Sequence, residues 1–179
     1  MVPPSFAFES FRMKIVLKVI DSISDWTGKI SSFLILVITG VILFEVIARY
    51  IFAKPTTWAF EISLSLYGVY VALLGAYVLV QGGHVNVDLL YARFSPRTRA
   101  GMNLFSWLIF FFWCGALVWT GWIRGWESLM IRESESTAFG CPIYPVKFSL
   151  AVGGSLLFLQ GVAGYVRNIY TFITGRKID

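Results

Sequence analysis

The sequence predicts an all-α membrane protein with four transmembrane helices, preceded by an amphipathic helix in the membrane interface. Of its 179 residues, 57% are hydrophobic and only 14% are charged, whereas soluble domains average about 45–50% and about 25%. The mean hydropathy is +0.72, and a domain of this size has too little interior to hide that much apolar surface from water. Four apolar runs have the length of about 20 residues that crosses a bilayer. These observations exclude a soluble globule and a disordered chain.

The first predicted element is an amphipathic helix over residues 10–26. Its apolar side chains, Trp26 among them, share one face, and Lys14 and Lys18 lie on the opposite face. This pattern is typical of a helix that lies in the membrane interface. We therefore expect Lys14, Lys18 and Trp26 to meet lipid. A cleaved signal peptide is not expected, because the apolar core begins only near residue 30 and lacks a small-residue cleavage site.

Transmembrane helices are predicted at about 30–52, 58–80, 104–123 and 146–166, within a single domain over residues 1–179. Segments in lipid must satisfy their own backbone hydrogen bonds, which long apolar runs do as helices. Strands of a membrane barrel would instead be about 10 residues long and alternating. The connection 53–57 is short, so the first two spans form an antiparallel hairpin. Ser95 and Pro96 supply the cap and the first-turn proline that start a helix before the third span.

The distribution of basic residues predicts that both termini lie in the cytoplasm. Ten of the 15 Lys and Arg residues fall on the side that holds the termini and the second loop, and five fall on the other side. Cytoplasmic segments carry this excess, so the net charge of +5 reflects membrane topology, and nucleic-acid binding is not expected. The ten are Arg12, Lys14, Lys18, Lys29, Arg93, Arg97, Arg99, Arg167, Arg176 and Lys177, and the five are Arg49, Lys54, Arg124, Arg132 and Lys147.

Three ionisable residues lie inside the first two spans: Glu45, Arg49 and Glu61. A charge within the membrane costs about 2.5–3.5 kcal/mol by insertion scales and normally has a partner. Glu45 and Arg49 are four residues apart in the favourable order, and the short loop brings Glu61 to a similar depth. We expect a structural ion-pair network in which Arg49 reaches both acids. The alternatives are an ion or proton relay and a contact to another membrane subunit.

Small residues recur along the second, third and fourth spans, including Gly68 and Gly75 in the second. They let membrane helices approach closely, either within this chain or against a larger membrane protein, and both interpretations stay open. His84 and Asp88 are four residues apart just after the second span. We expect them to make a local contact at the membrane edge, because two side chains are too few for a metal site.

The sequence offers no set of residues suited to catalysis, to a metal or to a cofactor. It has one His and two Cys, which excludes a bis-His haem within this chain and argues against the usual zinc sites. No Ser/His/Asp or Cys/His constellation is present, and no polar discontinuity interrupts a span as a solute site would. We therefore expect neither an enzyme nor a self-sufficient carrier, but one part of a larger assembly.

The most specific motifs lie between residues 45 and 90. Arg49-Tyr50 comes late in the first span, Trp58 and Glu61 open the second, and Gly83-His84-Val85-Asn86-Val87-Asp88 follows it. In order and spacing these motifs resemble the small, DctQ-like membrane subunit of tripartite ATP-independent periplasmic (TRAP) transporters, as do the size and the four spans. The family's W-x-E-E motif keeps only its second acid, Glu61, and Leu64 stands where an Arg is often found.

The resemblance implies a scaffold role in the bacterial inner membrane. In such systems a periplasmic solute-binding protein captures an organic acid or related solute, and a large permease subunit carries it inward on a sodium gradient by an elevator motion. The small subunit packs against that permease, so the substrate and sodium sites would lie on the partner. Trp58, Gly68, Gly75, His84 and Asp88 are then expected at contacts with the partner or at the membrane edge.

Two other functions fit parts of the sequence. A small, independent proton-coupled exporter would use Glu45 or Glu61 and would work when the chain is expressed alone. A membrane anchor of a redox complex would need haem ligands, and one His is too few within this chain. Neighbouring genes for a large permease and a secreted binding protein would favour the transporter subunit.

Overall fold

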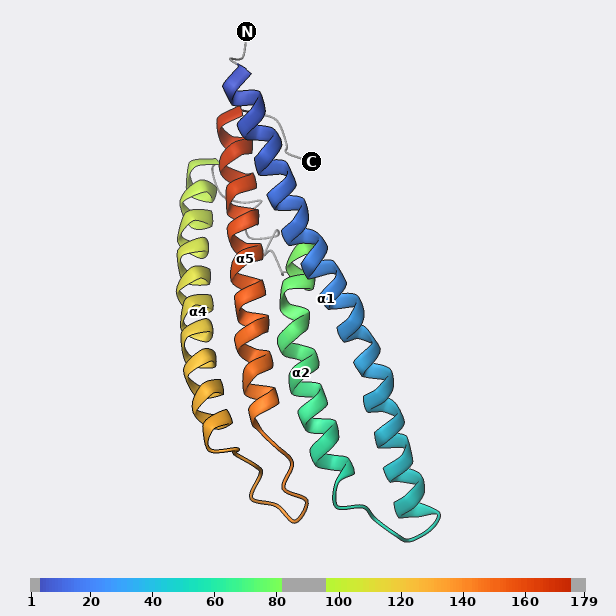
Figure 1. The fold of residues 1–179 in the computed structure, drawn as a ribbon. Coiled ribbons are helices and arrows are strands. Elements are labelled where there is room, and N and C mark those ends of the chain that lie inside the picture. Colours follow the sequence, from blue (N-terminus) through green and yellow to red (C-terminus); the bar gives the residue numbers. More distant parts are fainter. Residues whose placement is uncertain (1–3, 82–95, 175–179) are drawn as a thin grey trace.

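The computed structural model describes residues 4–81 and 96–174 of the chain (Figure 1). These residues form four long helices: α1 (Pro4–Tyr50), α2 (Ala59–Val80), α4 (Pro96–Met130) and α5 (Tyr144–Thr174). The described part of the chain has no β-strand, only an isolated bridge between Ser134 and Pro142. Each helix contains a stretch that is long and apolar enough to cross a membrane. The predicted all-α class with four spans is therefore confirmed.

The first helix is continuous, so the structure does not show residues 10–26 as a separate interfacial helix. At 1.5 Å per residue, its 47 residues reach about 70 Å, more than twice the hydrocarbon thickness. No proline separates the two predicted segments, and Gly28 between them packs on α2. A Cβ at Gly28 would lie 2.1 Å from the ring of Tyr77. Because nothing interrupts the backbone hydrogen bonds, the amphipathic segment continues directly into the span.

The other helices match the predicted spans to different degrees. α2 starts one residue after the predicted position 58 and ends at Val80 as expected. α4 begins at Pro96, as the proline predicts, and extends to Met130, beyond the predicted end near 123. α5 also exceeds its predicted span of 146–166 at both ends. A helix supplies its own hydrogen bonds, so it does not have to end where the apolar run ends.

The four helices lie side by side in a row (Figure 1). α4 contacts α5, α5 contacts α2, and α2 contacts α1, which also contacts α5. We call α5 the central helix because it contacts all three others. It is also the most buried: 39% of its most apolar window is buried, compared with 11% in each of the other three. The beginning of α1 and the end of α5 lie at the same end of the molecule (Figure 1), which agrees with four crossings of one membrane.

Glycines set how closely the neighbours of α5 approach it. A Cβ added at Gly153 would lie 2.0 Å from the carbonyl oxygen of Ala72 on α2. One at Gly161 would lie 2.2 Å from the ring of Phe110 on α4, and one at Gly121 of α4 would lie 3.0 Å from the backbone of α5. These small residues therefore serve packing within the chain, the first of the two interpretations that the sequence allows.

Aromatic rings fill the interface between α4 and α5 near the end where α1 begins. Trp107 and Phe111 of α4 pack on Tyr165 of α5, with ring centroids 5.7 and 5.9 Å apart. Phe111 also meets Phe158 at 5.5 Å, edge to face, a geometry that aromatic pairs favour. On the outer side of α4, by contrast, Trp119 is exposed. The aromatic residues of α4 are thus divided between internal packing and the outer surface.

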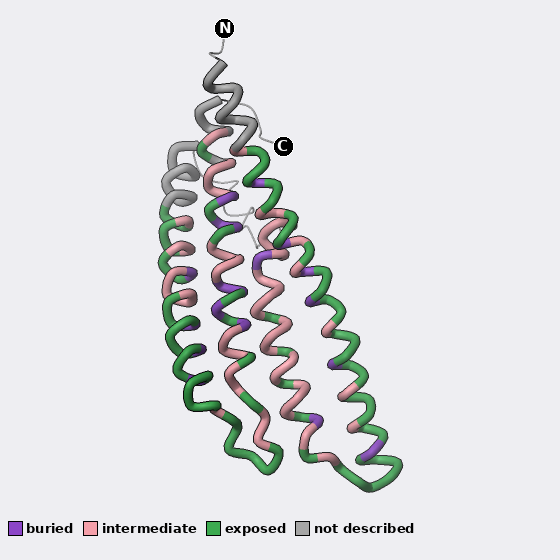
Figure 2. The backbone as a smooth tube through the Cα atoms, in the orientation of Figure 1, coloured by how far each residue is buried: buried purple, intermediate pink, exposed green. Residues whose placement is uncertain are grey.

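Most large apolar side chains of the described residues are exposed, and Figure 2 shows where exposed positions lie along the backbone. They occur on all four helices, whereas the buried hydrophobic positions are mostly small, with Ala59, Ala76 and Ala151 at 1% exposure or less. In water such a surface would be an aggregation liability. In a membrane it is the surface that acyl chains or another membrane protein cover.

Candidate functional site

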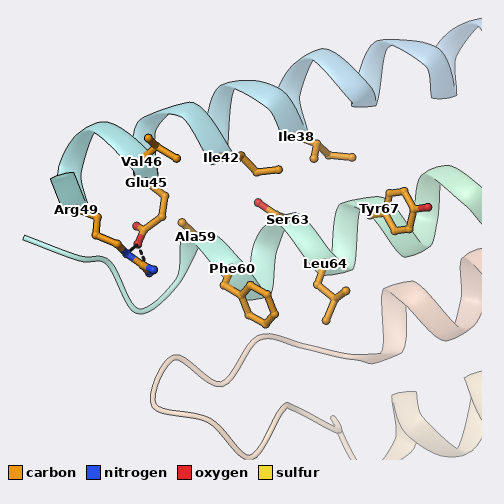
Figure 3. A pocket seen from close by; sticks show the side chains of 10 residues that line it. All are labelled: Ile38, Ile42, Glu45, Val46, Arg49, Ala59, Phe60, Ser63, Leu64 and Tyr67. Atoms are coloured by element: carbon orange, nitrogen blue, oxygen red, sulfur yellow. Dashed lines mark hydrogen bonds and ion pairs between the residues drawn. The ribbon is translucent and has the colours of Figure 1, made fainter. Parts of the chain in front are cut away.

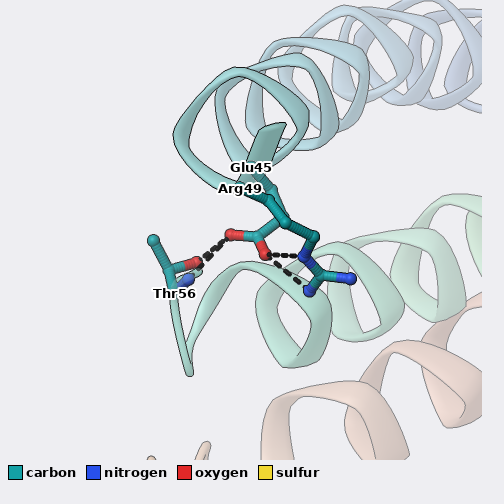
Figure 4. Close-up of polar contacts among 3 residues, drawn as sticks. All are labelled: Glu45, Arg49 and Thr56. Carbon is teal, nitrogen blue, oxygen red and sulfur yellow. Dashed lines mark hydrogen bonds and ion pairs between the residues drawn. The ribbon is translucent and has the colours of Figure 1, made fainter. Parts of the chain in front are cut away.

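Glu45 and Arg49 pair on the last turns of α1, beside the loop that leads to α2 (Figure 4). Nη2 and Nε of Arg49 donate to Oε1 of Glu45 at 2.7 and 3.1 Å. The second carboxylate oxygen, Oε2, accepts from the backbone N–H of Thr56 at 3.1 Å and from the Thr56 hydroxyl. The side chain of Glu45 is 14% exposed and that of Arg49 is 54% exposed. The carboxylate is therefore held inside the hairpin, and the guanidinium lies at its edge.

Glu61, in the first turn of α2, has a different partner from the one the sequence predicts. Its Oε2 accepts from the backbone N–H of Cys141 at 3.3 Å, and the Cys141 sulfur lies 3.7 Å from the hydroxyl of Ser65. Among the contacts of the described residues, none joins Glu61 to Arg49. The structure thus brings Glu45 and Arg49 together, whereas Glu61 fixes the α4–α5 loop onto α2.

A second polar network, which sequence reasoning missed, joins α1 to α5. Nε2 of Gln160 donates to Oδ1 of Asp21 at 2.8 Å, and Oγ of Ser24 donates to Oε1 of Gln160 at 3.1 Å. Nη1 of Arg167 donates to Asp21 Oδ1 at 3.1 Å, and its Nη2 pairs with Oδ2. Ser24 and Gln160 are both buried. Gln160 and Arg167 are seven residues apart, which places them on one helix face, and that spacing is the signal that predicts such a contact.

The loop between α4 and α5 is held by an ion pair and by backbone hydrogen bonds. Glu133 pairs with Lys147 of α5, and the N–H of Glu135 donates to the carbonyl of Cys141 at 2.9 Å. The hydrogen bond from Lys147 holds the pKa of Glu133 below its usual value. These contacts therefore hold the loop in one defined conformation.

Three of the predicted contact residues pack within the chain. A Cβ added at Gly68 would lie 3.0 Å from Val146 of α5, and one at Gly75 would lie 3.7 Å from a leucine of the same helix. Trp58 precedes α2 and stacks on Phe44 of α1 with ring centroids 5.7 Å apart. These residues position helices against one another, and their contact with a partner subunit or with the membrane edge stays a prediction.

The remaining predicted contact residues fall into two sets. His84 and Asp88 lie outside the described residues. Lys14, Lys18 and Trp26 are exposed on the first part of α1, where their side chains are accessible to lipid. Contact of these three with lipid stays a prediction.

The described residues contain no group of three or more His, Cys, Asp or Glu side chains suited to hold a metal ion. The carboxylates of Asp21, Glu45 and Glu61 have hydrogen-bond partners within the chain. Such contacts hold helices and loops together, as charged groups near hydrocarbon require. Fold and polar networks together define a small multi-pass membrane protein whose charged groups maintain its own architecture.

The particular family follows from a comparison with known proteins. The family model described as "Tripartite ATP-independent periplasmic transporters, DctQ component" matches residues 38–171, which include all of α2 and α4. The chain belongs to this family. The match confirms the resemblance seen in the sequence motifs. No curated protein sequence matches the chain.

Family membership establishes the coarse function. The chain is a small component of a TRAP transporter and a multi-pass protein of the inner membrane. The family is one of transport components and is not known for enzymes. Because these transporters are tripartite, membership also implies a large permease and a periplasmic binding protein as partners.

Proposed function

We propose that the chain is the scaffold subunit of a sodium-coupled, binding-protein-dependent importer of an organic acid or related solute. It packs against the large permease subunit, and the substrate and sodium sites lie on that partner. Both termini are in the cytoplasm, and the loops that carry Lys54 and Arg132 face the periplasm. In this role the chain contributes surface and rigidity within the membrane.

The observation that carries this proposal is the arrangement of the helices in a row. A compact bundle would hide one face of every helix, whereas here three of the four spans bury only 11% of their most apolar window. Exposed positions occur along all four helices of the row (Figure 2), and many of them are large apolar residues. In lipid, helices associate through close packing of such surfaces, so a flat array is suited to bracing a larger membrane protein.

The polar contacts support a scaffold over the alternative of an independent proton-coupled exporter. An exporter would need Glu45 or Glu61 to exchange protons with an aqueous path. Both carboxylates instead accept hydrogen bonds that fix loops, from Thr56 and from Cys141. Carboxyl groups engaged in this way are suited to a structural role.

A second part of the proposal concerns the outward face of the first part of α1. Its apolar residues Ile15, Val19 and Ile23 are each about half exposed, although the neighbouring face of α1 binds α5 through Asp21. We infer that this outward face meets lipid at the cytoplasmic surface, with Lys14 and Lys18 near anionic headgroups.

Co-purification combined with site-specific crosslinking tests the proposal. A tagged chain would be expressed together with its large permease subunit, with both native cysteines of the chain replaced by serine. A photoreactive benzophenone would be attached to a single cysteine at Phe33, Phe60 or Phe112, which are exposed positions on α1, α2 and α4. We expect stoichiometric co-purification and a crosslink to the large subunit from at least one position. Purification of the chain alone, with no crosslink from any position, would contradict the proposal.

A further inference from the structure

An apolar groove of about 420 Å³ runs between α1 and α2 in the half of the molecule that contains their connecting loop (Figure 3). Its walls are formed by aliphatic and aromatic side chains from both helices, and Glu45 and Arg49 stand at its loop end. The principal wall residues are Ile38, Ile42 and Val46 of α1 and Phe60, Leu64 and Tyr67 of α2.

The groove opens to the outside of the protein. Phe60 is 73% exposed and Leu64 is 60% exposed, so the described residues do not cover this wall. The residues of α2 that α5 contacts lie elsewhere, for example at Gly68 and Gly75. None of the described residues therefore occupies the groove.

The length of the groove matches one leaflet of a bilayer. From Ile38 to Arg49 the axis of α1 advances about 16 Å, and half of a hydrocarbon core of about 30 Å is about 15 Å. The apolar wall residues of α1, from Ile38 to Val46, take up about 12 Å of that distance, and the Glu45–Arg49 pair occupies the loop end. A phospholipid has the same order of groups along its length, with an apolar acyl chain toward the bilayer centre and a charged phosphate at the membrane surface.

The charge at the mouth fits a phosphate. Only Nε and Nη2 of Arg49 contact Glu45, and the other terminal nitrogen points away from the carboxylate (Figure 4). Thr56 donates two further hydrogen bonds to Glu45, so the carboxylate is anchored independently of Arg49. A guanidinium has five N–H donors in a fixed fork that suits phosphate oxygens, and the side chain is 54% exposed.

We propose that this groove is a binding site for one phospholipid, with an acyl chain between α1 and α2 and its phosphate on Arg49. The leaflet is the one on the side of the α1–α2 loop, which is the periplasmic leaflet in the proposed orientation. Glu45 acts as a positioning residue that holds the guanidinium toward the headgroup. The site lies between α1 and α2, away from the contacts that α2 makes with α5 at Gly68 and Gly75.

Photolabelling of the full chain, alone and in complex with the large subunit, tests this site. The probe is phosphatidylethanolamine with a diazirine in one acyl chain, in vesicles of phosphatidylethanolamine and phosphatidylglycerol, and labelled residues are located by mass spectrometry. Val46→Trp fills the groove, and Ile47→Trp adds the same ring at the next residue, which is exposed but does not line the groove. We expect labelling of the groove to fall at least about fivefold in Val46→Trp, or about 1 kcal/mol, and to be retained in Ile47→Trp.

A second pair of variants isolates the phosphate contact. Arg49→Gln removes the phosphate contact. Labelling of this variant by the phosphatidylethanolamine probe should therefore fall to about the level seen with a diacylglycerol probe that carries the same photoreactive chain but has no phosphate. Arg124→Gln removes another exposed arginine that does not line the groove and should change nothing. Equal labelling in both tryptophan variants would overturn the proposal, as would diacylglycerol labelling wild type as strongly as phospholipid. Groove labelling that disappears when the large subunit binds would assign the groove to that partner instead.

Discussion

Asp21 of α1 and Arg167 of α5 form an ion pair across 146 positions of the sequence. The pair is half-buried, and Gln160 beside it bonds both Asp21 and Ser24. It is the principal polar link between α1 and the central helix among the described contacts. α1 otherwise packs mainly on α2, so this network holds its first part against α5.

Removing the link should weaken the packing of the first part of α1 on α5, where Leu17 also contacts Ala163. We expect the Asp21→Ala, Arg167→Ala double-mutant cycle to show a coupling of about 1 kcal/mol, because the residues touch and share one network. Chemical unfolding of the purified chain in mixed micelles, followed by circular dichroism, measures it. Asp25 and Lys29 form a matched pair on the same helix, more exposed and within one turn, and their coupling should not exceed about 0.5 kcal/mol. Equal coupling in the two cycles would mean that the network has no special role.

Gly153 should tolerate no side chain, since a Cβ there would meet a backbone carbonyl of α2 at 2.0 Å. We expect Gly153→Ala to lower the free energy of unfolding by about 1–3 kcal/mol, the usual cost of overpacking. Gly40→Ala is the control, because nothing lies within 4 Å of a Cβ at that position. Alanine there should stabilise the helix by up to about 1 kcal/mol. If Gly153→Ala is as stable as Gly40→Ala, α2 and α5 are not packed as closely as described.

The stability that the Glu133–Lys147 pair gives to the loop between α4 and α5 should decrease in acid. Its pKa in the folded chain lies below the ordinary value of 4.5, chiefly because Lys147 donates a hydrogen bond to it. A lowered carboxyl pKa stabilises the fold above the ordinary value and loses that contribution as the pH falls through the folded pKa. We therefore expect Glu133→Gln to be less stable than wild type at neutral pH, and the two thermal midpoints to converge as the pH falls through the lowered pKa of Glu133. Glu127→Gln, at a more exposed pair, should follow wild type at every pH.

Sequence reasoning predicts the spans well because the length of an apolar run can be counted directly along the sequence. The limits of α2 and the start of α4 at Pro96 needed no tertiary information. The order of the helices in the row could not be predicted, since glycines occur on several helices and do not specify which helix each one faces. The same holds for Glu61, whose partner is a backbone N–H of a loop 80 residues away. The continuity of α1 was missed because an amphipathic pattern does not distinguish a separate helix from an extension.

The proposed orientation makes a prediction that labelling can check. In a background with Cys141 replaced by serine, single cysteines at Lys54 and Arg132 should react with a membrane-impermeant maleimide added to intact spheroplasts. A cysteine at Arg97 should react only after the membrane is opened, because the excess of basic residues is cytoplasmic. Labelling at position 97 but not at 132 from outside would reverse the topology.

Solute uptake into liposomes under an inward sodium gradient tests the scaffold role most directly. Four preparations would be compared with the periplasmic binding protein present: this chain alone, the large subunit alone, both together, and both together without the gradient. We predict uptake only when both subunits and the gradient are present, because in the proposed function the substrate and sodium sites lie on the large subunit. Robust uptake by this chain alone, or full uptake by the large subunit without it, would contradict the account.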